Sequence, residues 1–282
     1  MIATVDGRRI GYDDSGGRGT PVVLLHGFPL DRTVWDDVAG ALAGTRVIRV
    51  DLRGCGESDP SDGPALMELL AGDLAALLDQ LDVERAALVG QSMGGYVAFA
   101  FFRMYAERVA GLALVASHVA ADAIGTSAAG ASAEQRTLAG GRDALARTLE
   151  ESGSMGAAIA SYLPRYLAPA LYTERPELVE RVRAVMARQH PAGCAQLVRG
   201  MQARVGGEDL LADVQVPALV IAGAQDTYLT PRSLQATADA MHAAFVRLEG
   251  VGHLPMVEAP TPTGDALAAF AQRVRDDAAT RP

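Results

Sequence analysis

Residues 90–95 read Gly-Gln-Ser-Met-Gly-Gly and contain the pattern Gly-x-Ser-x-Gly, centred on Ser92. A continuous apolar run precedes this segment and a helical pattern follows it, which is the context of a nucleophile elbow. So tight a turn from strand to helix needs small neighbours, and the glycines supply them. The pattern therefore predicts that Ser92 presents its hydroxyl above a sheet as a nucleophile.

A serine hydroxyl needs a base within hydrogen-bond reach, and an acid that orients the base. Of the five histidines, His253 follows the last expected strand, at the sheet edge where open α/β folds place their sites. Asp226 follows another strand at the same edge. The order Ser92, Asp226, His253 is typical of a sheet that carries a nucleophile elbow. Asp122, which also follows a strand, is the alternative acid, although it already lies within the inserted segment described below.

Two backbone N–H groups are needed to stabilise the charge that develops on an attacked carbonyl. The first should come from Met93, the residue after the nucleophile. The second should come from residues 26–29, which read His-Gly-Phe-Pro. Because Pro29 has no N–H and biases Phe28 toward an extended backbone, the Phe28 N–H is the predicted second donor. We interpret His26 as structural, with a ring that hydrogen-bonds the loop and transfers no proton.

The elements that must position these residues alternate between strand and helix. Short apolar runs, typical of strands buried on both faces, are separated by stretches with helical spacing. The alternation predicts an α/β fold with a mostly parallel, doubly wound sheet that helices cover on both faces. The expected strands are residues 21–25, 46–51, 86–90, 109–116, 217–222 and 244–249, and the expected helices of this core are residues 35–42, 66–81, 93–105, 231–242 and 262–276.

A long segment interrupts the alternation after Ser117. From about residue 118 to residue 210 the sequence shows only helical periodicity, broken by Gly and Pro. A segment of this length is too long for a connecting loop, so we expect a separate all-helical lobe over 118–210 and a core formed by 1–117 and 211–282. The expected helices of the lobe are residues 133–151, 155–168, 175–189 and 192–204.

Composition and charge exclude several other classes of protein. The chain has 34 acidic and 25 basic residues, a net charge of −9, which argues against nucleic acid as the main partner. Every basic residue is Arg, so Schiff-base chemistry, a phosphate-binding loop with its Lys and a Ser-Lys dyad are excluded. The two cysteines are expected to be free thiols. No apolar segment approaches the roughly 20 residues of a membrane span, so we expect a soluble, cytoplasmic protein without a membrane partner.

Metal and dinucleotide motifs are also missing from the sequence. There is no His-Glu-x-x-His, no Cys-x-x-Cys and no Gly-x-Gly-x-x-Gly after a strand. We therefore expect neither a metal nor another cofactor. The sequence gives no indication of the oligomeric state.

Five segments together resemble the α/β-hydrolase fold superfamily, over nearly the whole chain. They are residues 26–29, 51–58, 90–95, 223–226 and 252–260. The resemblance implies the same roles as the residue-level reasoning. These are nucleophile Ser92, acid Asp226, base His253, and oxyanion donors Phe28 and Met93. The resemblance further implies that residues 51–58 shape a loop and carry no chemistry.

The resemblance also implies that the inserted lobe is a helical cap over the active site and that it sets substrate choice. Residues 191–201 are similar to the corresponding part of enol-lactonases and related esterases. Tyr162, Tyr166 and Met155 are candidates to line the substrate pocket, and ordinary packing between cap helices is the alternative for each. His118 follows a core strand and is a further candidate to face the pocket.

These features predict a cofactor-independent serine hydrolase that cleaves carboxylic esters or lactones of small molecules through an acyl-enzyme. A serine nucleophile disfavours the epoxide hydrolases and haloalkane dehalogenases of this fold, which use Asp. The same apparatus supports perhydrolase or haloperoxidase, C–C hydrolase and lyase chemistry, and the sequence does not separate these activities. A small-molecule sensor with little or no turnover is the alternative outside the enzymes.

Overall fold

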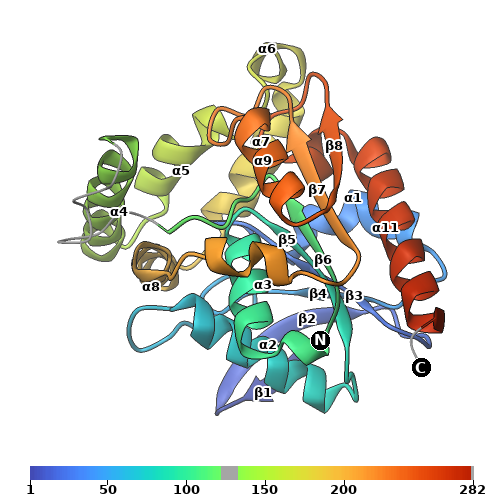
Figure 1. Ribbon diagram of the computed structural model, residues 1–282. Helices are drawn as coiled ribbons and strands as arrows, with labels where there is room; N and C mark the ends of the chain where they lie inside the picture. The colour runs from blue at the N-terminus through green and yellow to red at the C-terminus, as the bar shows by residue number, and fades with distance from the viewer. Residues whose placement is uncertain (122–132, 281–282) are drawn as a thin grey trace.

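The computed structural model describes residues 1–121 and 133–280, and in this part of the chain a single eight-stranded sheet forms the centre (Figure 1). Its strands are β1 (Ile2–Val5), β2 (Arg8–Asp14), β3 (Val22–Leu25), β4 (Val47–Val50), β5 (Ala86–Gln91), β6 (Val109–Val115), β7 (Ala218–Gly223) and β8 (Ala244–Leu248). Their order across the sheet is β1-β2-β4-β3-β5-β6-β7-β8. The pairs β1–β2 and β2–β4 are antiparallel, and the others are parallel. The predicted mostly parallel sheet is thus confirmed.

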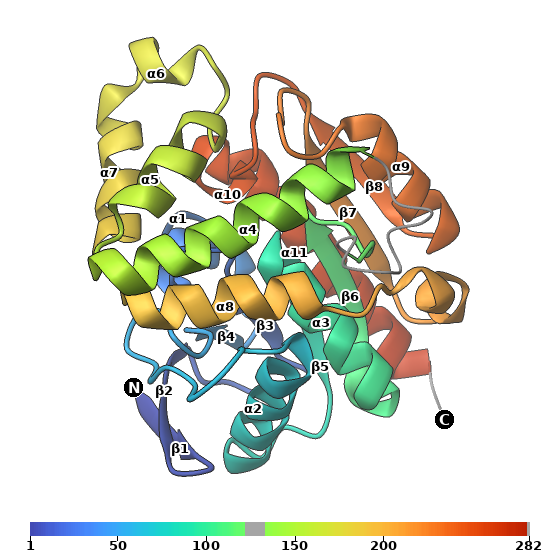
Figure 2. The same ribbon diagram turned by 90° about the vertical axis from the view of Figure 1, so that its left-hand side faces the viewer.

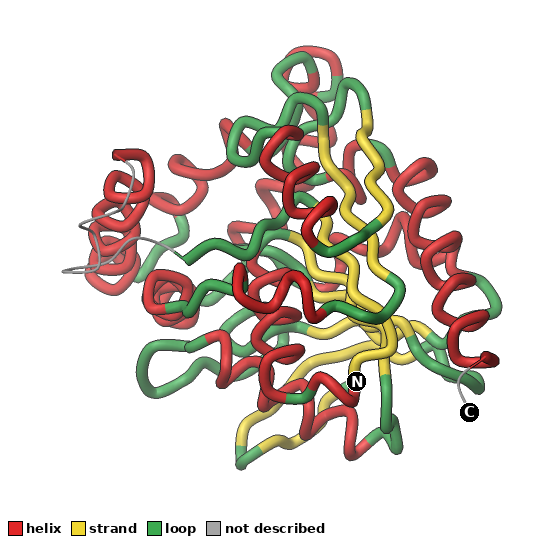
Figure 3. Tube along the Cα trace, viewed as in Figure 1, coloured by secondary structure: helices red, strands yellow, loops and turns green. Residues whose placement is uncertain are grey.

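Helices cover both faces of this sheet (Figures 1 and 3). One face carries α2 (Met67–Gln80), α3 (Met93–Met104) and α9 (Pro231–Ala240), and the other carries α1 (Asp36–Ala39) and α11 (Pro260–Thr280). A separate hydrophobic cluster lies on each face. Every residue of β5 and β6 is buried, as a strand between two helical layers requires. This double cover explains why the sequence reads as continuous apolar runs at these strands.

The helical cap is formed by elements that lie between β6 and β7 in the chain. They are α4 (Ala133–Ser152), α5 (Gly156–Tyr162), α6 (Leu171–Glu174), α7 (Pro176–Ala187) and α8 (Pro191–Ala203). Helices α4 and α8 lie side by side in front of the sheet (Figure 2). The inserted, all-helical character of this segment agrees with the prediction. The domain limits at residues 118 and 210 stay a prediction.

Two predicted helices are wrong in their extent. The predicted helix 155–168 ends as α5 at Tyr162, and a 3-10 turn, Leu163–Arg165, follows. Pro164 lies in that turn, and a proline removes an N–H and blocks the continuation of an α-helix. The predicted helix 35–42 is split, because α1 is a single turn with a 3-10 turn on each side.

Other features of the described chain bear on the expected class of protein. None of its helices is both long enough and apolar enough to cross a membrane. Cys55 and Cys194 are free and buried. Across residues 1–121 and 133–280, no three His, Cys, Asp or Glu side chains are grouped so that they could hold a metal ion.

Candidate active site

Ser92 forms the turn between β5 and α3 on its own, since β5 ends at Gln91 and α3 begins at Met93. Its backbone has φ 48° and ψ −115°, a left-handed region that costs energy for a side chain other than glycine. The helix can approach the sheet because residue 94 is Gly, where a Cβ would lie 2.3 Å from the Leu25 carbonyl oxygen. This turn presents the Ser92 hydroxyl at the carboxyl end of the sheet, as the sequence predicts.

The structure brings the three predicted catalytic side chains together in one hydrogen-bonded row. His253 Nε2 lies 3.0 Å from Ser92 Oγ, and His253 Nδ1 lies 2.8 Å from Asp226 Oδ2. An ionised carboxylate only accepts hydrogen bonds, so Nδ1 donates to Asp226 and Nε2 is left to accept from the Ser92 hydroxyl. The side chains of His253 and Asp226 are 4% and 0% exposed. His253 can therefore accept the proton of Ser92 at a place that is shielded from bulk water.

Backbone hydrogen bonds fix the acid and the base of this row. Asp226 Oδ1 accepts from the N–H groups of Tyr228 (2.7 Å) and Leu229 (3.1 Å), which leaves Oδ2 for the imidazole. The His253 N–H donates to the Tyr166 carbonyl (2.9 Å). The Gln91 side-chain amide donates to the His253 carbonyl (3.0 Å). The base is thus held from the cap on one side and from the nucleophile elbow on the other.

Glu258 braces the loop that carries the base. Its carboxylate accepts from the N–H groups of Gly252 (2.8 Å), Leu254 (2.9 Å) and Ala168 (2.7 Å). Burial raises the pKa of Glu258, although these three hydrogen bonds favour its charged form. The same carboxylate therefore joins both sides of His253 to the cap.

The two predicted oxyanion donors, Phe28 and Met93, flank the nucleophile. A Cβ at Gly27 would lie 3.1 Å from the Cβ of Ser92, so the loop at residue 27 runs directly against the elbow. In the part of the chain that the structure describes, neither the Phe28 N–H nor the Met93 N–H donates a hydrogen bond. Both groups are thus available for the oxygen of a bound substrate.

His26 has the structural role that the sequence suggests. Its Nδ1–H donates to the Gly27 carbonyl (2.8 Å), and its Nε2 accepts from the Leu52 N–H (3.0 Å). Burial lowers the pKa of His26, so the ring stays neutral and both nitrogens are occupied. The residues after β4 are structural too, since the carboxylate of Asp51 accepts from the Arg32 N–H (2.8 Å) and the Glu57 N–H (2.9 Å).

A cavity of about 370 Å³ opens over the nucleophile. The three residues predicted to face the substrate, His118, Tyr162 and Tyr166, line it together with Ser92 and His253. The Tyr166 ring stacks on the imidazole of His253 at a centroid distance of 5.5 Å.

Met155 does not line this cavity and is packed in the hydrophobic core. Asp122, the alternative acid, lies outside the described residues, and Asp226 occupies the acid's place beside Nδ1.

The family model of the alpha/beta hydrolase fold matches residues 20–260 of this chain. The chain belongs to the α/β-hydrolase family of enzymes.

Solved structures of other α/β hydrolases superpose on almost all of the chain. A thermophilic esterase from Thermogutta terrifontis, with malate bound, is 35% identical, with a TM-score of 0.87 and 97% of each chain covered. The enol-lactonase from Burkholderia xenovorans LB400 is 28% identical, with a TM-score of 0.83, and covers 96% of this chain and 100% of its own.

Similarity to some curated relatives is confined to a segment. The dihydrolipoyllysine-residue acetyltransferase component of the acetoin cleaving system of Pseudomonas putida is 42% identical over 124 residues. The match covers 43% of this chain and 34% of that relative, so the shared segment spans about a third of the relative's length.

Among the cavity-lining side chains that sequence reasoning missed, four are aromatic or charged: Tyr96, Arg142, Arg165 and Tyr228. A signal existed for two of them. Tyr96 lies in the first turn of the helix that Ser92 precedes, so it stays close to the nucleophile. Tyr228 lies two residues after the predicted acid, and its ring is 4.9 Å from that of His253. The two arginines belong to cap segments, and nothing in the sequence indicates which cap side chains turn toward the core.

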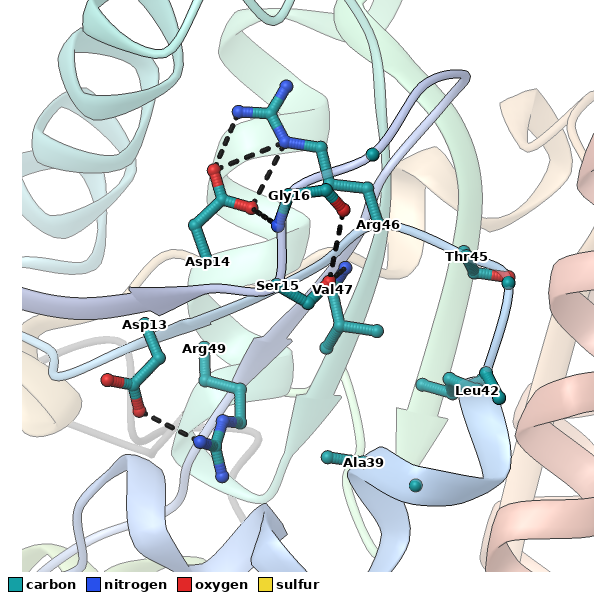
Figure 4. Close-up of a pocket in the computed structure, with 14 residues that line it drawn as sticks. Asp13, Asp14, Ser15, Gly16, Ala39, Leu42, Thr45, Arg46, Val47 and Arg49 are labelled. Carbon is teal, nitrogen blue, oxygen red and sulfur yellow. Dashed lines mark hydrogen bonds and ion pairs between the residues drawn. The ribbon is translucent and has the colours of Figure 1, made fainter.

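A larger cavity of about 590 Å³ lies at another place in this α/β hydrolase, between strands β2 and β4 on one side and the end of α1 on the other (Figure 4). Its charged groups are already paired, Arg46 with Asp14 at 2.7 Å and Arg49 with Asp13 at 2.9 Å. The hydroxyl of Ser15 accepts from a backbone N–H, and no histidine is among the described residues that line the cavity. This cavity therefore lacks an activated nucleophile and is not the candidate site.

The Tyr166 hydroxyl donates to the Phe28 carbonyl and so links the cap to the predicted oxyanion loop. We expect Tyr166→Phe to lower kcat about tenfold with a much smaller change in KM, because small displacements of a catalytic group are costly. Steady-state kinetics with p-nitrophenyl butyrate measure this effect. The matched control is Tyr172→Phe, which removes a cap hydroxyl bonded to the Leu163 carbonyl outside the cavity. Equal kcat values for Tyr166→Phe and wild type would contradict the role of this link.

Burial and the nearby Arg204 lower the pKa of His118 to about 3 from its usual 6.5. Between these two values the unfolded chain binds a proton that the folded chain does not, so stability falls as the pH drops below 6.5. We expect wild type to lose about 2 kcal/mol more than His118→Gln between pH 7 and pH 5. Urea unfolding of both proteins at the two pH values measures this difference. Equal losses of stability in the two proteins would show that His118 does not take up a proton on unfolding between pH 7 and pH 5.

Proposed function

We propose that this α/β hydrolase is a cofactor-independent serine hydrolase that cleaves carboxylic esters or lactones of small molecules. The observation that carries the proposal is the hydrogen-bonded row of Ser92, His253 and Asp226 at the floor of a cavity. The esterase that is 35% identical and the enol-lactonase that is 28% identical support the choice of ester and lactone bonds.

The reaction begins when Ser92 Oγ attacks the substrate carbonyl while His253 Nε2 takes its proton. The Phe28 and Met93 N–H groups stabilise the oxyanion, and Asp226 stabilises the imidazolium that forms. His253 then gives the proton to the leaving alkoxide, and an acyl-enzyme on Ser92 remains. A water molecule that His253 deprotonates attacks the ester and releases the acid. In a lactone, the leaving hydroxyl stays attached to the acyl group.

The test is a burst-phase assay with p-nitrophenyl acetate and butyrate, run beside Ser92→Ala. We expect a rapid release of p-nitrophenol that depends on Ser92, followed by steady turnover. A burst without turnover would favour a small-molecule sensor over an enzyme. A burst that is unchanged in Ser92→Ala would contradict the proposal, as would absence of both a burst and labelling of Ser92 by a fluorophosphonate.

A further inference from the structure

The cavity over Ser92 differs in charge from the rest of the chain. The whole chain has a net charge of −9. The described residues that line the cavity include two arginines, Arg142 and Arg165, but no Asp or Glu. Asp226 has a fully buried side chain that is hydrogen-bonded to His253. An acidic protein therefore surrounds a cavity whose described wall is cationic, and such a cavity attracts anions.

The hydroxyl of Tyr96 is aimed as a donor by its neighbour His118. The Ala120 N–H donates to His118 Nδ1 (3.1 Å), so in the neutral ring the proton is on Nε2. Nε2 lies 3.1 Å from the Tyr96 hydroxyl and therefore donates to its oxygen. Within the described chain the Tyr96 proton then has no acceptor, and it can be donated to a ligand in the cavity.

Arg204 restrains both Tyr96 and His118. Its guanidinium lies 4.0 Å from the centre of the Tyr96 ring and donates to the Ala120 carbonyl (3.1 Å from Nε). The side chain of His118 is thus fixed through Ala120, and the Tyr96 ring is fixed by direct stacking. A donor that is rigid before the ligand arrives binds it with little loss of conformational entropy.

Arg165 also lines this cavity. Its guanidinium lies 4.5 Å from the centre of the Tyr228 ring and donates to the Ser161 carbonyl (3.1 Å). Among the described residues the Arg165 side chain has only this carbonyl and ring contact and no ion pair with a carboxylate, so its guanidinium keeps N–H donors for a ligand. Arg142 adds a positive field to this space, and that field acts to lower the pKa values of both His118 and Tyr166.

We propose that the cavity selects esters or lactones that carry a carboxylate, which Tyr96 and Arg165 bind in the positive field of Arg142 while Ser92 attacks the ester carbonyl. Guanidinium groups match the two oxygens of a carboxylate, and a phenol adds a directed donor. The inference rests on the proposed function, since it names the substrate class of that same site.

The experiment compares pairs of esters of equal shape and different charge. The first pair is mono-p-nitrophenyl adipate and p-nitrophenyl 6-methylheptanoate, in which an isopropyl group replaces the acyl-side carboxylate. The second pair is 4-(carboxymethyl)phenyl butyrate and 4-isobutylphenyl butyrate, which place the charge on the leaving group. The quantity measured is the ratio of kcat/KM for the anionic ester to that for the neutral ester. We expect a ratio of about 10 or more in at least one pair, falling as salt is added.

Three variants and one control show which residues cause the preference for anionic esters. Tyr96→Phe, Arg142→Gln and Arg165→Gln should each lower this ratio, by about 3-fold to 20-fold. The control is Arg232→Gln, which removes an exposed arginine of α9 outside the cavity and should leave the ratio unchanged. Arg165 is exposed, so its variant is expected to fold even if the partly buried Arg142 is needed for stability.

The outcomes separate this inference from the function on which it rests. Ratios near or below one in both pairs, with Ser92-dependent hydrolysis of the neutral esters, would overturn the carboxylate subsite and leave the ester hydrolase in place. A high ratio that none of the three variants lowers would also overturn it. Absence of Ser92-dependent turnover of all four esters would overturn both proposals.

Discussion

Ser92→Ala is expected to lower kcat for p-nitrophenyl butyrate by about 10⁶-fold, leaving only the contribution of the oxyanion donors and of substrate binding. The reason is chemical, since the hydroxyl at 3.0 Å from His253 Nε2 is the atom that forms the acyl-enzyme. The substitution removes one oxygen and adds none, so the strained turn and the packing around it are kept. Measurement of kcat at saturating ester, with an enzyme stock free of wild-type contamination, checks this value.

The matched control is Ser161→Ala, which changes a second serine that lines the same cavity. Ser161 has no imidazole within hydrogen-bond reach in the described structure, so we expect kcat to change less than about threefold. A large loss in Ser161→Ala together with a small loss in Ser92→Ala would refute the assignment of the nucleophile.

Asp226→Asn is expected to lower kcat by about 10⁴-fold. The amide oxygen can still accept from the Tyr228 N–H, so the local backbone should hold. The amide NH₂ group, however, would face Nδ1 of His253 and favour the tautomer with the proton on Nε2. That tautomer cannot take the proton of Ser92, and the amide cannot stabilise the imidazolium. Pre-steady-state release of p-nitrophenol measures the slowed acylation directly.

The comparison for this variant is Asp122→Asn, at the other acid that the sequence offers. We expect it to leave acylation within about twofold of wild type, because Asp226 already occupies the position beside Nδ1. If Asp122→Asn were the slower of the two, the acid would be Asp122 instead.

Much of the site could be predicted because its three key side chains each follow a buried strand. Ser92 follows β5, Asp226 follows β7 and His253 follows β8, and the carboxyl ends of parallel strands meet at one edge. Short apolar runs bounded by Gly mark such strands clearly, so both the sheet and the order of the residues along the chain are readable from local patterns.

The cavity wall could not be predicted in the same way, because it depends on long-range packing. Tyr166 bonds to Phe28 across 138 residues of sequence, and Glu258 bonds to Ala168 across 90. Helical periodicity gives the buried face of a cap helix but not the angle at which that helix crosses the core. Tyr162 and Tyr166 were therefore candidates for ordinary packing and for substrate contact alike, and Arg165 gave no signal.

The most direct test of the central claim, that His253 activates Ser92 as a nucleophile, is covalent labelling by diethyl p-nitrophenyl phosphate followed by peptide mapping. We predict one stable diethylphosphoryl group, located on Ser92, that is absent from Ser92→Ala and forms at least about 10³-fold more slowly in His253→Ala. Labelling of another residue, or equally fast labelling of Ser92 in wild type and in His253→Ala, would contradict the account.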